Sequence, residues 1–194
     1  MIYNFEHSLE HERNQAIKAD TFYREKLNAT DIKRFNTDSE ADMEMQRQDV
    51  DVLISLNNVT YRVSEKFRDK DYGDLYVEVF SKYPKIQGWL KTGSPNAILY
   101  FTPNSVYWIT HKSLATFCLN TLFPLIPQKW YSELYQSHKT IITKYLKLQN
   151  KLFKINIIQA HNSLPDGTKW ETIGISAAFS LFEENGVKIK KMNL

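Results

Sequence analysis

The sequence has little of what small secreted or repetitive proteins need. It contains a single cysteine, Cys118, with six glycines and six prolines in 194 residues. One cysteine excludes an internal disulfide and a zinc site made of cysteines. No apolar run approaches the roughly 20 residues that span a bilayer, and the start of the chain lacks the basic-then-apolar pattern of a signal peptide. We therefore expect a soluble cytoplasmic protein without membrane association.

The composition is that of a folded protein, with 42% hydrophobic and 24% charged residues. The net charge of +3 is unevenly distributed, because residues 111–194 hold 11 Lys and Arg against 5 Asp and Glu. A basic segment is compatible with a polyanionic partner such as nucleic acid, and equally with a solvated lysine-rich face.

The order of patterns predicts one α/β domain over residues 1–194, with a mixed central β-sheet flanked by helices. Its parts are N-terminal helices in 1–47, a sheet core in 48–110, and a basic helical and C-terminal strand part in 111–194. Helices are expected over 5–33, from a cap within Asp38-Ser39-Glu40 to about Gln46, over 112–122, and from Pro127 to about Leu152. Strands are expected over 49–56, 59–68, 75–81, 97–101, 106–110, 155–159 and 172–179.

The clearest local pattern is a charged hairpin. The pair Asn57-Asn58 tolerates the positive φ angles of a two-residue turn, which fixes the strand register. In that register Asp51 faces Ser64 and Asp49 faces Lys66, so that these four side chains and Arg68 share one side. The apolar residues of both strands share the other side and predict a core face.

A third strand, Leu75–Ser81, carries Glu78 among apolar neighbours, where an unpaired carboxylate is costly. If this strand pairs beside 59–68, Glu78 lies close to Ser64 and Lys66. Carboxylates of this kind suit Mg²⁺ or Mn²⁺, and a metal with an adjacent lysine suits phosphodiester hydrolysis. Simple cross-strand ion pairs, Asp49 with Lys66 and Glu78 with Arg62, explain the same spacing equally well.

The motifs in this region resemble a known superfamily. They are Gln46-Arg47-Gln48-Asp49-Val50-Asp51, Ser64-Glu65-Lys66, Glu78 and Gly88-Trp89-Leu90. Their order and spacing over residues 40–107 resemble the PD-(D/E)XK (restriction-endonuclease-like) nuclease superfamily, in a small bacterial and phage branch. The resemblance implies a restriction-endonuclease-like fold and a hydrolase that cuts nucleic acid, with DNA favoured over RNA.

Carried over to this chain, the resemblance makes Asp51 the first metal ligand, Lys66 the catalytic lysine and Glu44 an assisting acid. The acid expected two residues before Lys66 is Ser64 here. Glu78 is our first candidate for the missing carboxylate, and Glu65, turned by a β-bulge, is the second. Two alternatives stay open: a catalytically degenerate nucleic-acid-binding protein of the same fold, and a phage-encoded inhibitor or other protein–protein interaction module.

Further basic residues are candidates for nucleic-acid contacts. They are Arg47, Arg62, Arg68, Lys139, Lys144 and Lys147. The last three fall in the helix expected after Pro127, interleaved with aromatic residues that could be either core or base-stacking groups. The superfamily also makes a homodimer conceivable, although no heptad pattern supports one.

Overall fold

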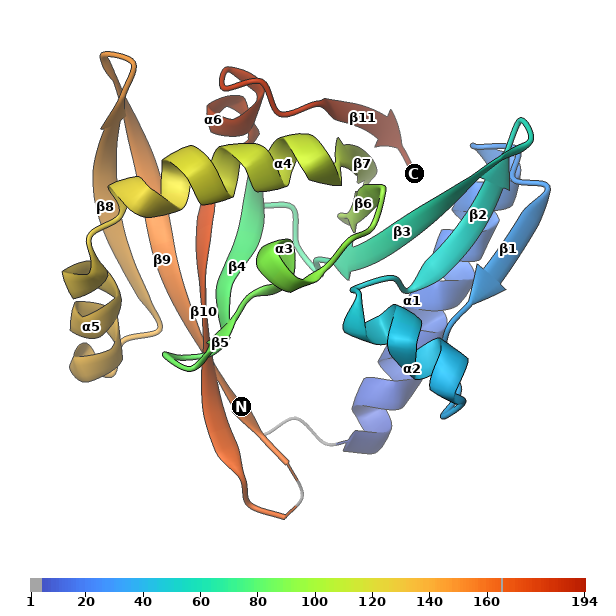
Figure 1. Cartoon of the computed structure of the whole chain (residues 1–194), viewed down its shortest axis with the longest axis horizontal. Helices are drawn as coiled ribbons and strands as arrows, with labels where there is room; N and C mark the ends of the chain where they lie inside the picture. The colour runs from blue at the N-terminus through green and yellow to red at the C-terminus, as the bar shows by residue number, and fades with distance from the viewer. Residues whose placement is uncertain (1–4, 165) are drawn as a thin grey trace. The chain divides into compact units, whose positions relative to one another are not determined.

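The computed structural model describes residues 5–164 and 166–194, with side chains from residue 14 onward. The helices are α1 Phe5–Glu25, α2 Glu40–Arg47, α3 Trp89–Thr92, α4 His111–Phe117, α5 Gln128–Ser137 and α6 Phe179–Glu183, with a π-helical turn at Cys118–Leu122 and a 3-10 turn at Phe123–Leu125. The strands are β1 Asp31–Arg34, β2 Val52–Leu56, β3 Val59–Phe67, β4 Asp74–Lys82, β5 Ile86–Gln87, β6 Ala97–Phe101, β7 Ser105–Thr110, β8 Ile141–Leu148, β9 Lys151–Ser163, β10 Lys169–Ala178 and β11 Ile189–Asn193 (Figure 1).

The described chain is mixed α/β, as expected, but its strands form two sheets instead of one. One compact unit comprises Met1–Lys70, Gly93–Ile109 and Lys190–Leu194, and the other comprises Asp71–Thr92 and Thr110–Ile189. These units cut across the three sequential parts expected from the sequence. In the described residues, no helix is both long and apolar enough to cross a membrane.

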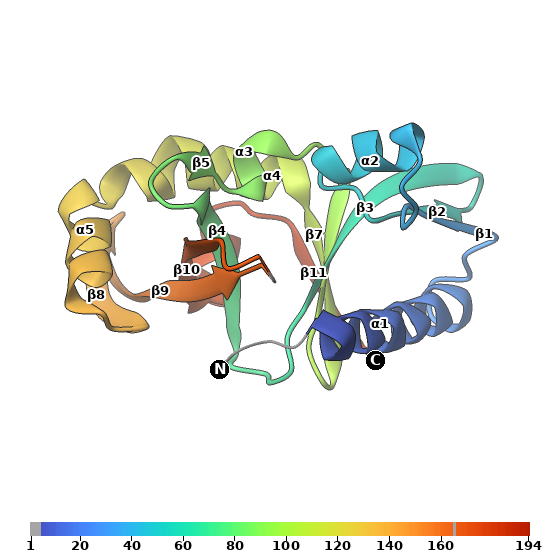
Figure 2. The same cartoon turned by 90° about the horizontal axis from the view of Figure 1, so that it is seen from below.

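The first unit contains the mixed sheet β1-β2-β3-β6-β7-β11. Strands β1, β2 and β3 are antiparallel neighbours, whereas β3 and β6 run parallel. The helices α1 and α2 lie on opposite faces of the β1–β3 part of this sheet (Figure 2). The side that meets α1 is apolar, with Phe22 and Tyr23 of α1 packed in one cluster with Val52, Ile54 and Val63. The opposite side carries the charged residues Asp49, Asp51 and Lys66 of the hairpin.

The hairpin prediction is confirmed in its turn and register. Asn57 and Asn58 have φ angles of 49° and 64°, as a two-residue turn of this kind requires. Leu56 pairs with Val59, and the ladder continues without a shift to Val52 opposite Val63. The α2 prediction is also confirmed, because Ser39 caps the helix by accepting a hydrogen bond from the Asp42 amide.

The second unit contains the sheet β5-β4-β10-β9-β8, in which each pair of neighbouring strands is antiparallel. The sequence-based placement of β4 beside β3 is therefore wrong: β4 lies between β5 and β10 in this sheet, and the second neighbour of β3 is β6. Consecutive strands often pair, but here the chain leaves the first sheet after β3 and returns to it at β6.

The long helix expected from Pro127 to Leu152 is also wrong. Helix α5 ends at Ser137, and His138 follows in the left-handed conformation with φ of 55°. Residues 141–163 then form the β8–β9 hairpin around Gln149 and Asn150, whose φ angles are 47° and 64°. The β-branched run at 141–143 and this second two-residue turn favour strands.

Candidate active site

The candidate site lies where α2 leads into β2. The α2 helix ends at Arg47 with Gln48 as its C-cap. Asp49 follows with φ of 55°, held by a hydrogen bond from its amide to the Gln46 carbonyl at 2.9 Å. Aspartate tolerates this left-handed backbone better than most residues. The Asp51 amide then donates to the Val63 carbonyl at 2.9 Å and extends the β2–β3 ladder. This local geometry fixes two carboxylates, Asp49 and Asp51, on the polar side of the hairpin.

Four side chains form one hydrogen-bonded group on that side, which we call the Asp49–Asp51 group: Asp49, Asp51, Ser64 and Lys66. The Ser64 hydroxyl donates to Asp49 Oδ2 at 2.8 Å and lies 3.4 Å from Asp51 Oδ2. Lys66 Nζ lies 2.8 Å from Asp49 Oδ1. The juxtaposition of these residues, predicted from the register, is confirmed.

The Asp51 carboxylate is largely buried. The Glu65 amide donates to Asp51 Oδ2 at 2.6 Å. Burial raises the pKa of Asp51, and the neighbouring Asp49 adds to this effect, while the Lys66 charge and the Glu65 amide oppose it. Burial thus disfavours the charged form of Asp51, and a cation bound beside it would stabilise that form.

Glu65 points to the other side of the sheet. Its carboxylate, with only 5% of the side chain exposed, accepts hydrogen bonds from Arg34 Nη1 at 2.7 Å and from the Tyr23 hydroxyl at 2.5 Å. Arg34 also binds Asp20 at 2.8 Å. The pairing of β3 with β6 continues without a shift from Val63 to Phe67, so the bulge that would turn Glu65 toward Asp51 is absent from these described strands.

This buried network changes the ionisation of its members. Burial lowers the pKa of Arg34, but the hydrogen bonds and charges of Glu65 and Asp20 outweigh it and raise the pKa overall. Burial and the Glu65 carboxylate together raise the pKa of Tyr23. The Glu65 carboxylate is therefore held by Tyr23 of α1 and Arg34 of β1, which argues against its predicted role as a metal ligand.

The acid expected on α2 does not join the Asp49–Asp51 group. Glu44 is exposed and accepts hydrogen bonds from Gln48 at 2.6 Å and Arg47 at 3.4 Å, which lower its pKa. Gln46, the first residue of the Gln46–Asp51 motif, donates to the Phe35 carbonyl at 2.8 Å. In this structure the Glu44 side chain binds residues at the C-terminal end of α2, and the Gln46 side chain binds the loop that precedes the helix.

The predicted arginines lie around the hairpin with different partners. Arg62 donates to Gln48 Oε1 and to Ser94 Oγ, so it braces the end of α2. Arg47 is exposed beside Glu44. The Arg68 amide donates to the Phe101 carbonyl at 2.9 Å, which places Arg68 at the end of β3.

Glu78 belongs to the second unit. It lies half-buried on β4, opposite Gly174 of β10. A Cβ atom on Gly88 would lie 2.2 Å from the Glu78 carbonyl oxygen. The Gly-Trp motif therefore has a packing role, since only glycine allows this approach. Strand pairing does not bring Glu78 to Lys66, which corrects the expectation drawn from the sequence.

The predicted basic residues after Pro127 are divided by the β8–β9 hairpin. Lys139 lies just before β8, and Lys144 pairs with Glu133 of α5 at 2.8 Å. Lys147 and Tyr145 are exposed, and alternation puts them on the opposite side from Lys144. The register sets Tyr145 opposite Lys154. These three residues, Tyr145, Lys147 and Lys154, form what we call the β8–β9 surface.

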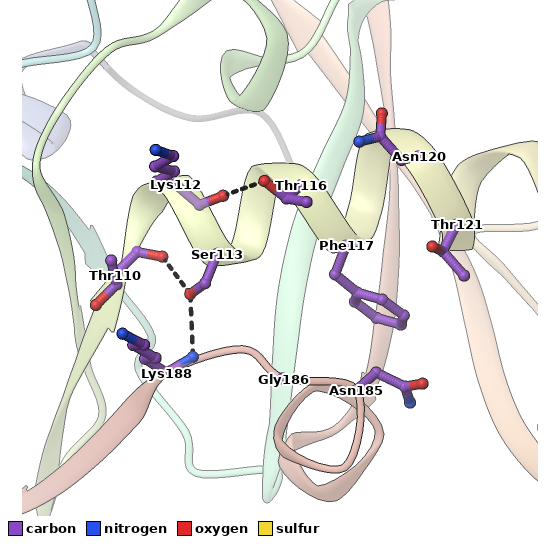
Figure 3. A pocket seen from close by; sticks show the side chains of 10 residues that line it. All are labelled: Thr110, Lys112, Ser113, Thr116, Phe117, Asn120, Thr121, Asn185, Gly186 and Lys188. Atoms are coloured by element: carbon purple, nitrogen blue, oxygen red, sulfur yellow. Dashed lines mark hydrogen bonds between the residues drawn. The ribbon is translucent and has the colours of Figure 1, made fainter.

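A separate hollow of about 510 Å³ lies in the second unit between α4 and residues 185–188 (Figure 3). It is lined by hydroxyl and amide side chains with Lys112 and Lys188, and no carboxylate lines it. The Ser113 hydroxyl donates to the Thr110 carbonyl at 2.9 Å and accepts from the Lys188 amide at 3.0 Å. The Ser113 hydroxyl therefore links Thr110 to Lys188 in the wall of the hollow. Because both bonds hold this hydroxyl, it is poorly placed to act as a nucleophile.

The donor set of the Asp49–Asp51 group fits a hard divalent cation. Within the described residues, no group of three or more His, Cys, Asp and Glu side chains gathers as a metal site. Mg²⁺, however, is commonly held by one or two carboxylates with several waters, which is what Asp49 and Asp51 offer. The chain matches no protein-family model, no curated protein and no solved structure. The case for a function therefore depends on the geometry of the site.

Proposed function

We propose that this protein is a metal-dependent nuclease that hydrolyses phosphodiester bonds, with DNA as the favoured substrate. The observation that carries the proposal is the gathering of Asp51, Asp49 and Lys66 around Ser64 on one face of the β2–β3 hairpin. Of these residues, Asp51 and Lys66 are the ones to which the PD-(D/E)XK resemblance assigns the first metal ligand and the catalytic lysine. The parallel pairing of β3 with β6 in a mixed sheet is compatible with the restriction-endonuclease-like fold.

The residues take different roles in this proposal. Asp51 holds Mg²⁺ or Mn²⁺ through its buried carboxylate. Bound at this site, the metal supplies a Lewis acid that stabilises charge on the phosphate and lowers the pKa of a water. Lys66 lies one residue beyond Glu65 on the same side as Asp51, where its ammonium orients the attacking water or neutralises charge on the phosphate.

The β8–β9 surface is the proposed contact for the nucleic-acid backbone and bases. Lysines bind phosphates without sequence preference, and an exposed tyrosine can stack on a base. Tyr145 is 60% exposed, and its register partner is Lys154. This surface replaces the lysine-rich helix that the sequence suggested.

A nucleic-acid-binding protein without catalysis is the second candidate, and Ser64 is the observation that favours it. Serine donates a hydrogen bond to Asp49 at 2.8 Å but brings no negative charge to the metal. A two-carboxylate site binds a divalent cation more weakly than a three-carboxylate site.

Cleavage of single-stranded DNA, double-stranded DNA and RNA in Mg²⁺, Mn²⁺ and EDTA tests the proposal. We expect metal-dependent cutting by the wild type and its loss in Asp51→Ala. Metal-independent binding that weakens with salt, without cutting on any substrate, favours the second candidate. Absence of both cutting and binding favours a protein–protein interaction module.

A further inference from the structure

We propose that Asp49 supplies the second metal-binding carboxylate of this site, in the place of the acid that Ser64 lacks. The inference rests on the proposed function and names a residue that the PD-(D/E)XK pattern does not. Asp49 stands before the strand, two residues from Asp51, whereas the pattern expects the second acid on β3.

The geometry puts the Asp49 carboxylate where a side-chain carboxylate at position 64 would act. The Ser64 hydroxyl lies 2.8 Å from Asp49 Oδ2 and 3.4 Å from Asp51 Oδ2, so both acids face one point in front of residue 64. Two carboxylates that face one point, with room for water ligands, are the arrangement in which Mg²⁺ is held.

The charges of the group favour a cation as well. Within the hydrogen-bonded group, two carboxylates stand against the single ammonium of Lys66. That ammonium binds Asp49 Oδ1 at 2.8 Å, with 26% of the lysine side chain and 17% of the aspartate side chain exposed. A positive group already occupies the position beside Asp49, and Asp49 and Asp51 would hold a divalent cation there, which would leave the Lys66 ammonium available to the substrate.

Of the two acids chosen from the sequence, Glu65 is less well placed and Glu78 belongs to the other sheet. Glu65 is held on the opposite side of the sheet by Arg34 and Tyr23. Glu78 lies on β4 of the second sheet, where its strand pairs with β10 and β5. Asp49 is bonded to both Ser64 and Lys66.

The test is the affinity for Mn²⁺, measured by isothermal titration calorimetry on the full chain, in parallel with cleavage. Asp49→Asn removes the charge and keeps a residue that tolerates the left-handed backbone at φ of 55°. Asp31→Asn, at the exposed start of β1, is the matched control, and Glu78→Gln tests the rival acid. Ser64→Asp in the Asp49→Asn background restores a carboxylate at the shared point. Thermal unfolding of each variant checks the fold.

We expect Asp49→Asn to weaken Mn²⁺ binding by about tenfold or more, Asp31→Asn and Glu78→Gln to leave it unchanged, and the double variant to recover most of it. Wild type that binds Mn²⁺ and cuts, with Asp49→Asn doing the same, overturns the assignment of Asp49 and leaves the nuclease standing. Wild type that neither binds Mn²⁺ nor cuts overturns the proposed function, and the Asp49 assignment with it.

Discussion

Ser64 of β3 donates its hydroxyl hydrogen to Asp49, the residue that follows the C-terminal end of α2, at 2.8 Å. This bond joins the position where the PD-(D/E)XK resemblance expects a carboxylate to Asp49, whose carboxylate the resemblance gives no role. Because Lys66 binds the other oxygen of Asp49, the serine and the lysine hold that carboxylate between them. The site is therefore organised around Asp49 as much as around Asp51.

Asp51→Asn should make the metal-free protein more stable. Burial raises the pKa of Asp51, so its negative charge costs free energy in the folded state at neutral pH. Asparagine keeps an acceptor for the Glu65 amide without the charge. We expect the melting temperature in EDTA at pH 7.5 to rise by about 2–4 °C, equal to roughly 1 kcal/mol for a chain of this size.

The same reasoning gives the direction of the pH effect. With a folded pKa above the ordinary value of 3.8, the folded state holds the proton more tightly than the unfolded chain. The penalty is absent below that value, grows as the pH rises, and is complete above the folded pKa. The difference between variant and wild type should therefore shrink when the melt is repeated near pH 4. A variant less stable than wild type at pH 7.5 contradicts this account.

Glu65→Gln should damage stability and leave metal affinity alone. The substitution removes the charge that pairs with Arg34, whose side chain is 18% exposed. A broken buried pair costs about 3–5 kcal/mol, and Asp20 still pairs with Arg34, so we expect about 2–3 kcal/mol in urea unfolding. The Arg34→Met, Glu65→Gln double variant should recover part of the loss. Weakened Mn²⁺ binding with unchanged stability would instead make Glu65 the ligand.

Gly88→Ala should destabilise the second unit strongly. The new Cβ would lie 2.2 Å from the Glu78 carbonyl oxygen and 2.7 Å from its carbon, and both are backbone atoms. We expect a loss of about 3 kcal/mol in chemical unfolding. Gly73→Ala is the control, because its site is open and only its φ of 66° opposes alanine, at about 1–2 kcal/mol. Equal losses in the two variants would show that the close approach at Gly88 is unimportant.

The β8–β9 surface predicts a salt-dependent DNA affinity. Lys147→Gln should weaken binding and lower the slope of log affinity against log salt by about 0.7–0.9, as expected for one lost phosphate contact. Tyr145→Ala should cost about 1–3 kcal/mol if a base stacks there. Lys144→Gln is the matched control, since Lys144 lies on the other side of β8 and pairs with Glu133. Fluorescence anisotropy over a salt series measures all three variants, and an effect of Lys144→Gln equal to that of Lys147→Gln rules this surface out.

The hairpin and its charged side were predictable because one local signal determines them. Asn57-Asn58 fixes a two-residue turn, and the two-residue period of a strand then decides which side chains share a side. A similar pair, Gln149-Asn150, was missed after Pro127, because the apolar spacing from Trp130 to Leu148 also fits a helix. In the folded hairpin every second residue of 141–148, starting with Ile141, is exposed, and the residues between them are partly or fully buried.

The partners of Glu65 and the place of Glu78 depend on tertiary structure that local patterns do not carry. The β1 strand has four residues, three of them charged, so nothing in its sequence predicts that Arg34 reaches a buried carboxylate on β3. Glu78 follows β3 closely in sequence, but the chain enters a second sheet between them. Sequence spacing therefore suggested the wrong neighbour for the strand that carries Glu78.

The most direct test of the account is the rate of DNA cleavage in Mn²⁺ by Lys66→Ala compared with wild type. Lys26→Ala, which removes an exposed lysine just after α1, is the control for lost charge, and melting curves confirm that each variant is folded. The account predicts metal-dependent cutting by wild type and Lys26→Ala, abolished by EDTA, with a fall of about 10²-fold or more in Lys66→Ala. Cutting by Lys66→Ala at the wild-type rate, or no cutting by folded wild type on any DNA or RNA substrate, would contradict it.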